Sequence, residues 1–79
     1  MLRVFLNSTD KVKEFVGVTV TFDGDIDVVC GRYIVDGKSI MGILSLDLTK
    51  ELELLLNGVT KDEEMKLVEN LKLAGLISK

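Results

Sequence analysis

The sequence predicts a two-layer α+β sandwich in which a four-stranded sheet is covered on one face by three helices. Two observations favour this fold class. The 79 residues are 47% hydrophobic and 29% charged, a balance typical of a folded chain with enough length for one small domain, residues 1–79. Strand-like and helix-like spacings of apolar residues follow one another as strand, helix, strand, strand, helix, strand and helix.

The first expected strand covers residues 2–6, a short apolar run that alternates well enough for a strand. The polar run 7–10 then offers several side-chain oxygens that can cap a helix. We expect this helix to bury one apolar stripe, namely Val12, Phe15, Val16 and Val20. The β-branched run 18–21 also fits a strand by propensity, so the sequence leaves the end of the helix open.

A β-hairpin is expected next. Residues 23–25 are typical of a turn, and the apolar runs 26–30 and 33–35 follow it. Only Gly31 and Arg32 separate the two runs, which is the length of a tight hairpin loop. The sequence therefore predicts two antiparallel strands here.

A short helix is expected after the hairpin. Residues 36–38 break the second strand, and Ser39 is placed to cap a helix over residues 40–46. Gly42 weakens this prediction, because glycine lowers helix propensity.

The remaining elements are a strand and a helix. Leucine at positions 52, 54 and 56 predicts a strand with one buried face. Thr60 and Glu63 have the spacing of a capping box, which predicts the start of a helix that Gly75 ends. The side of this helix expected to face the core carries Met65, Val68, Leu71 and Leu76.

The residue counts exclude whole classes of chemistry. The chain contains no histidine, the usual general base near neutral pH and a frequent metal ligand. Its single cysteine, Cys30, excludes a disulfide within the chain and fits a reducing compartment. We therefore expect no enzyme activity, no metal and no cofactor.

Charge and hydropathy limit the partners. A net charge of −3 gives no basic field that would attract a phosphate backbone, and the longest apolar stretches are only a few residues. We expect a cytoplasmic protein that binds neither nucleic acid nor membranes directly, and whose partners are other proteins.

Three features suggest sites but have simpler explanations. The aspartates at positions 23, 25 and 27 lack the glycine and glutamate of a calcium loop, so turn formation explains them better. Cys30 ends an apolar strand, where a lone cysteine is usually a small core residue. The acidic run 62–64 suits the first turn of a helix, although it would also serve as a docking patch.

Ser39 is the more informative candidate. At a helix N-cap, free backbone amides converge on the hydroxyl, so a phosphate added there would be held. The alternative is that Ser39 only caps its helix, as such serines do in unrelated proteins.

The segment Lys38-Ser39-Ile40-Met41-Gly42, with Ser45-Leu46 shortly after it, resembles the regulatory-serine segment of HPr. HPr is the small phosphocarrier of the bacterial sugar phosphotransferase system. The resemblance extends back through Phe22-Asp23-Gly24-Asp25-Ile26, which is similar to the start of the second strand of that family. It implies an open-faced sandwich of four antiparallel strands and three helices over the whole chain.

The chain departs from this family where HPr carries its phosphate. The family has a histidine in a G-x-H-x-R-P-A motif at the start of the first helix. In the ungapped register, Ser8 occupies the histidine position, Asp10 the arginine position and Lys11 the proline position. Because a serine phosphate is an ester of low transfer potential and no histidine exists in the sequence, relay through phosphohistidine is excluded.

The regulatory half of the family's function remains. The resemblance implies that an HPr kinase/phosphorylase phosphorylates Ser39. It also implies that the chain binds a catabolite-control repressor or components of the phosphotransferase system. The residues expected at the partner-binding surface are Lys38, Ile40, Met41 and Leu44. Ile43 and Leu46 are expected to point into the core instead.

A second class of function stays open. The same fold could be reused as an interaction or dimerisation domain that binds no component of the phosphotransferase system. Recognition of Ser39 by the kinase discriminates between the two.

Overall fold

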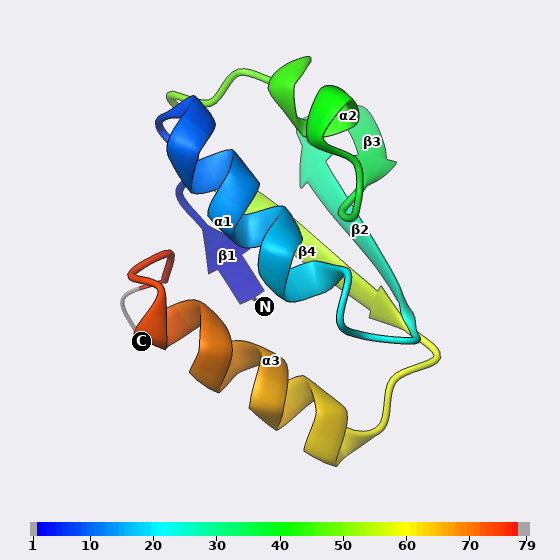
Figure 1. The fold of residues 1–79 in the computed structure, drawn as a ribbon. Coiled ribbons are helices and arrows are strands. Elements are labelled where there is room, and N and C mark those ends of the chain that lie inside the picture. The colour runs from blue at the N-terminus through cyan, green and yellow to red at the C-terminus, as the bar shows by residue number, and fades with distance from the viewer. Residues whose placement is uncertain (1, 78–79) are drawn as a thin grey trace.

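The computed structural model describes residues 2–77, and its elements follow the predicted order (Figure 1). The elements are β1 (Leu2–Val4), α1 (Thr9–Thr19), β2 (Asp25–Cys30), β3 (Tyr33–Asp36), α2 (Ile40–Leu44), β4 (Leu52–Asn57) and α3 (Lys61–Leu73). The first strand ends two residues earlier than expected, at Val4, and the short helix ends at Leu44, two residues before Leu46. The α+β class and the order of elements are confirmed.

The four strands form one sheet in the order β1-β4-β2-β3, and every neighbouring pair is antiparallel. Val28 of β2 lies between Leu54 of β4 and Val35 of β3, which aligns the apolar side chains on one face. In the loop between β2 and β3, Gly31 has a φ of 61°, a value required at the first central position of such a hairpin turn. The central strands are β4 and β2, so β1 and β3 are the edges.

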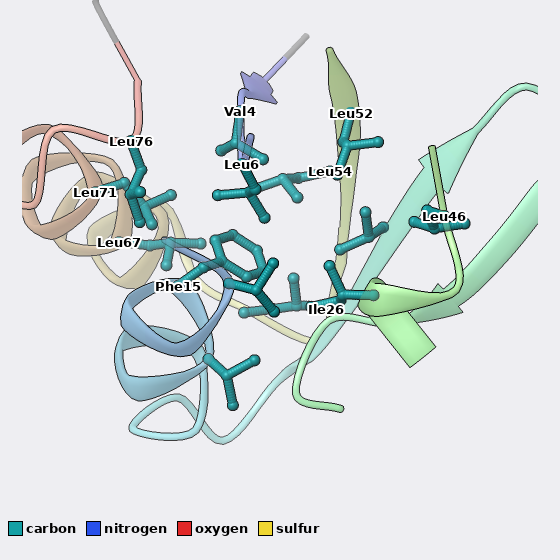
Figure 2. Packing of buried hydrophobic residues seen from close by; sticks show 14 of the residues in the cluster. Val4, Leu6, Phe15, Ile26, Leu46, Leu52, Leu54, Leu67, Leu71 and Leu76 are labelled. Carbon is teal, nitrogen blue, oxygen red and sulfur yellow. The ribbon is translucent and has the colours of Figure 1, made fainter. Parts of the chain in front are cut away.

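The helices cover one face of this sheet, and the core lies between the two layers (Figure 1). Figure 2 shows Phe15 of α1 and Leu67 and Leu71 of α3 directed toward side chains of the strands. On β4, the alternation of buried Leu52 and Leu54 with more exposed neighbours matches the predicted pattern. Among the residues that the structure describes, none forms a helix on the opposite face of the sheet.

Two expected core residues are exposed. Val20 is 55% exposed, because α1 ends at Thr19 and the buried side chain of the last turn is Thr19 itself. Met65 is 64% exposed, whereas Leu67, two residues later, is buried. Two residues correspond to about 200° of rotation around a helix, so the two side chains lie on opposite sides of α3. The predicted stripe of α3 was therefore wrong at Met65 and omitted Leu67.

The structure confirms the predicted start and end of α3, namely the capping box at Thr60 and the termination at Gly75. Thr60 Oγ1 accepts from the N–H of Glu63 at 3.1 Å, and Glu63 Oε1 accepts from the N–H of Thr60 at 2.8 Å. At the other end, Gly75 has a φ of 74°, and the N–H of Leu76 donates to the carbonyl of Leu71 at 2.9 Å. This closing pattern is a Schellman motif, in which glycine adopts the left-handed conformation at low cost.

No helix within residues 2–77 is long and apolar enough to cross a membrane.

Candidate functional site

The turn in front of Ser39 is held close to β2. The N–H of Gly37 donates to the carbonyl of Ile26 at 2.7 Å. A Cβ atom at position 37 would lie 2.7 Å from that same oxygen and 2.8 Å from Cγ2 of Ile26. Only glycine permits this approach without displacing the strand, so Gly37 fixes where the next helix begins.

Hydrogen bonds join the same turn to α1 and to the loop that follows α1. The buried hydroxyl of Thr19, at the end of α1, donates to the carbonyl of Gly37 at 2.7 Å. The ammonium group of Lys38 donates to the carbonyl of Phe22, and the N–H of Lys38 donates to Oδ1 of Asp36 at 2.9 Å. The backbone leading to Ser39 is therefore fixed by α1 and by the loop after it.

Ser39 caps α2 as predicted. Its backbone is extended, with φ −111° and ψ 114°, and its hydroxyl oxygen accepts from the N–H of Gly42 at 3.1 Å. A Cβ atom on residue 42 would lie 3.3 Å from that oxygen and 3.4 Å from Cβ of Val35. Gly42, a weak helix former, thus keeps the space around the hydroxyl open and lets α2 lie close to β3.

The five-residue helix α2 has one buried and one exposed side. Ile43 is fully buried, and Leu46 beyond the helix is 9% exposed, so both join the core as expected. On the outer side Ile40, Met41 and Leu44 are 37%, 84% and 40% exposed. These three apolar side chains, together with Lys38 on the other side of Ser39 in the sequence, form what we call the α2 surface.

The start of α1 also has a serine cap, but its surroundings differ from those of Ser39 at the start of α2. Ser8 is the N-cap, and its hydroxyl oxygen accepts from the N–H of Lys11 at 3.2 Å. Asp10 lies exposed in the first turn, so its negative charge adjoins the free amides of the helix. Nearby, Lys11 lines an open groove of about 520 Å³ that also includes Arg3 and Phe5. The capping hydroxyl and the carboxylate of Asp10 both suit the start of a helix.

The other sequence candidates have structural explanations. Glu63 serves in the cap of α3, and hydrogen bonds from the backbone N–H and the side chain of Thr60 lower the pKa of its carboxyl group. Cys30 is partly buried against the core. Within residues 2–77 no three acidic, cysteine or histidine side chains are grouped so that they could hold a metal ion, and this includes the aspartates 23, 25 and 27.

Two residues that position Ser39 were not predicted. Thr19 occupies the buried place on α1 that Val20 was expected to take, and its hydroxyl reaches across 18 residues to Gly37. The sequence signal for Gly37 was only that of a turn, because its close approach to Ile26 depends on the pairing of β2 with β3. A threonine on an otherwise apolar stripe is the one local sign that a polar group is needed there.

No family model matches the sequence, and no curated protein matches it either. Among solved structures, HPr-C-His from Thermoanaerobacter tengcongensis matches with a TM-score of 0.68 and 26% identity, over 90% of each chain. Crh, described as the catabolite repression containing protein of Bacillus subtilis, matches with a TM-score of 0.67 and 26% identity. That match covers 99% of this chain and 90% of Crh, whose structure is described as an intertwined dimer with a swapping domain.

These matches agree with the architecture and with the resemblance found in the sequence. The order of elements and the antiparallel sheet are those of the HPr fold, and both structural relatives span nearly the whole chain. This chain therefore has the HPr fold.

Proposed function

We propose that this protein is a regulatory, protein-binding module that acts through Ser39 and the α2 surface. The observation that carries the proposal is the exposure of three apolar side chains, Ile40, Met41 and Leu44, on one turn of helix directly after a capping serine. Exposed apolar side chains gathered in one place are typical of surfaces that bind other proteins.

Ser39 is the proposed site of phosphorylation by an HPr kinase/phosphorylase. Its hydroxyl already lies within hydrogen-bond distance of the N–H of Gly42, and it leads a turn of helix whose first amides have no helical partner. A phosphate at this position accepts hydrogen bonds from such amides and adds negative charge beside Lys38. Because α2 has only five residues, the individual amides matter more than a helix dipole.

The α2 surface is the proposed docking surface for the kinase and for a catabolite-control repressor. Of the apolar side chains on this surface Met41 is the most exposed, and Ile40 and Leu44 are each exposed by more than a third. Burying Met41 against a partner removes a large apolar side chain from water, which favours association by about 1.5–3 kcal/mol. The description of Crh as a catabolite repression protein supports a role of this kind.

A role as phosphocarrier in sugar uptake is not proposed. The sequence contains no histidine, and Asp10 places a negative charge where the family has its arginine. Repulsion between Asp10 and an incoming phosphoryl group opposes transfer at this end of α1.

Intact-mass spectrometry tests the phosphorylation. The protein is incubated with ATP, magnesium and an HPr kinase/phosphorylase from the same source, beside a Ser39→Ala variant and an ordinary HPr. We expect one added phosphate on the unaltered chain and none on the variant. An unmodified chain, with ordinary HPr phosphorylated in the same tube, would contradict the proposal and favour reuse of the fold as an interaction or dimerisation domain.

The docking surface is tested by comparing the same substitution at two exposed methionines, one on α2 and one on α3. Met41→Asp places a charge in the middle of the α2 surface, whereas Met65→Asp places the same charge on an exposed position of α3. We expect kcat/KM of the kinase to fall at least about tenfold for the first variant and to stay unchanged for the second. Equal effects of the two substitutions would show that kinase recognition does not involve α2.

A further inference from the structure

The outer edge of β3 is an unprotected sheet edge. β3 pairs with β2 on one side only, and the figure shows it at the outside of the sheet (Figure 1). At the opposite edge, just beyond β1, the N–H of Phe5 donates to the carbonyl of Leu76 at 3.3 Å, so the segment after α3 lies against that side. Sheet edges are usually blunted by bulges, proline or charged side chains, and of these the four residues of β3 contain only the charge of Asp36.

The hairpin determines which backbone groups of β3 face outward. Cys30 and Tyr33 flank a two-residue loop, so they form a hydrogen-bonded pair, and the pairs alternate from there. Every second residue from Tyr33 onward directs its backbone groups toward β2, and the N–H of Gly37, which donates to Ile26, fits this alternation. The N–H groups of Ile34 and Asp36 and the carbonyl of Ile34 therefore point away from β2.

Within residues 2–77, the charged side chains along this edge have no ion-pair partner, although Asp36 accepts a hydrogen bond from the N–H of Lys38. Ile34 is 61% exposed on the face of the sheet without helices. Asp36 lies directly opposite Asp27 of β2, and like charges in that position are unfavourable. Arg32 is exposed in the hairpin turn, and the one ion pair within residues 2–77 joins Arg3 to Glu53 elsewhere on the sheet.

We propose that β3 pairs antiparallel with β3 of a second copy of this chain, with Ile34 opposite Ile34 at the two-fold axis. The two Ile34 residues then exchange both of their outward hydrogen bonds, and their side chains cover each other. The same register brings Arg32 of each copy opposite Asp36 of the other. Each arginine thereby offsets the repulsion between Asp27 and Asp36, and the two sheets become one continuous sheet.

Charge selects this register over its neighbours. Backbone groups and side chains both alternate along a strand. The partner strand can therefore shift only in steps of two residues if the outward N–H and carbonyl groups of both copies are to stay paired. One such shift places Ile34 opposite Asp36, and the next places Asp36 opposite Asp36. The register centred on Ile34 is the one that pairs apolar with apolar and opposite charge with opposite charge, so the edge is complementary to itself.

Charge reversal tests the proposal with the full chain. Sedimentation equilibrium should show a dimer that dissociates on dilution. Arg32→Asp and Asp36→Arg each place like charges opposite one another at both ends of the paired strands, and each should raise the dissociation constant about tenfold or more. An equimolar mixture of the two variants should form a heterodimer as tightly as the unaltered chain, because every facing pair is again of opposite sign.

Two further features keep the test decisive. Rescue by mixing shows that both variants are folded. As a control, Lys72→Asp on α3 changes the net charge by the same amount as Arg32→Asp and should leave association unchanged. A chain that stays monomeric up to concentrations on the order of 1 mM would overturn the proposal. So would a dimer that neither β3 variant weakens, as expected for exchange of another element between copies, or a mixture that does not associate. The test uses neither Ser39 nor a kinase, so it stands or falls separately from the proposed function.

Discussion

The helices α1 and α2 are both capped by a serine at their N-termini, but the surroundings of the two serines differ. Ser8 Oγ accepts from the N–H of Lys11 at 3.2 Å, and Ser39 Oγ accepts from the N–H of Gly42 at 3.1 Å. Both serines precede their helix in extended conformation. The local hydrogen bond is therefore the same, and it says nothing about function.

The difference lies in what surrounds each cap. Ser8 is exposed and is followed by a carboxylate, Asp10, which stabilises the helix and repels a phosphate. Ser39 is half-buried, follows Lys38, and opens a helix that exposes apolar side chains. The comparison teaches that a capping serine becomes a candidate regulatory site only through its neighbours.

The largest expected effect is the difference in unfolding free energy between substitutions on the buried and on the exposed side of α2. Ile43→Ala should lower the free energy of unfolding by about 3 kcal/mol, because it removes a fully buried side chain and leaves a cavity. Met41→Ala, at a side chain that is 84% exposed, should change it by less than about 0.5 kcal/mol. Urea unfolding measures both. A strongly destabilised Met41→Ala variant would mean that Met41 belongs to the core and cannot be a docking residue.

The next effect concerns how firmly Ser39 is positioned. Gly37→Ala should cost about 2 kcal/mol of stability, because the new methyl group overlaps the carbonyl of Ile26. Gly17→Ala, in the middle of α1 with nothing within 4 Å of the added atom, should instead raise stability by roughly 0.5 kcal/mol. Thermal unfolding of the two variants gives the comparison. Tolerance of alanine at position 37 would show that the turn before Ser39 is not tightly held.

The two caps themselves should be equal in stability and unequal in function. Ser8→Ala and Ser39→Ala each remove one capping hydrogen bond, so each should cost about 1 kcal/mol in urea unfolding. In the kinase assay, Ser8→Ala should be phosphorylated like the unaltered chain, and Ser39→Ala should not be phosphorylated. Loss of phosphorylation in the Ser8 variant would remove the distinction between the two ends.

The smallest effect comes from the cap of α3, the one helix whose cap includes a titrating group. Hydrogen bonds from Thr60 hold the pKa of Glu63 below its ordinary value of 4.5. A lowered pKa in the folded state means that this stabilisation is complete above pH 4.5 and is lost as the pH falls through the lower folded value. Glu63→Gln should therefore flatten the decline of unfolding free energy in acid, while Ser8→Ala and Ser39→Ala should leave its slope unchanged. Parallel acid profiles for all the variants would contradict this role of Glu63.

Much of the fold could be predicted from local signals. The hairpin at Gly31 and Arg32, the capping box at Thr60 and the alternation on β4 each determine their element within a few residues. The errors at Val20 and Met65 have one cause. Several helical stripes fit the spacing of apolar residues in α1 and α3, and contact with the sheet decides which stripe is buried.

The site was predicted in part. Ser39 as N-cap follows from the local sequence, and the inward direction of Ile43 was expected from the resemblance to HPr. The structure agrees with both. The bond from Thr19 to Gly37 and the approach of Gly37 to Ile26 join segments far apart in the chain. Such contacts exist only after the sheet and helices have assembled, so no local pattern could reveal them. Phosphorylation of Ser39 and binding at the α2 surface remain predictions.

The most direct test of the difference between the two serine caps is to map the surface that a kinase contacts. Isotope-labelled protein is titrated with an HPr kinase/phosphorylase, and the amide resonances are followed by NMR. We predict that the changes centre on residues 38–44, including Ser39 and Met41, and that Ser8 and Lys11 are unaffected. Changes centred on the start of α1, or no changes where an ordinary HPr binds, would contradict the claim that function lies at Ser39.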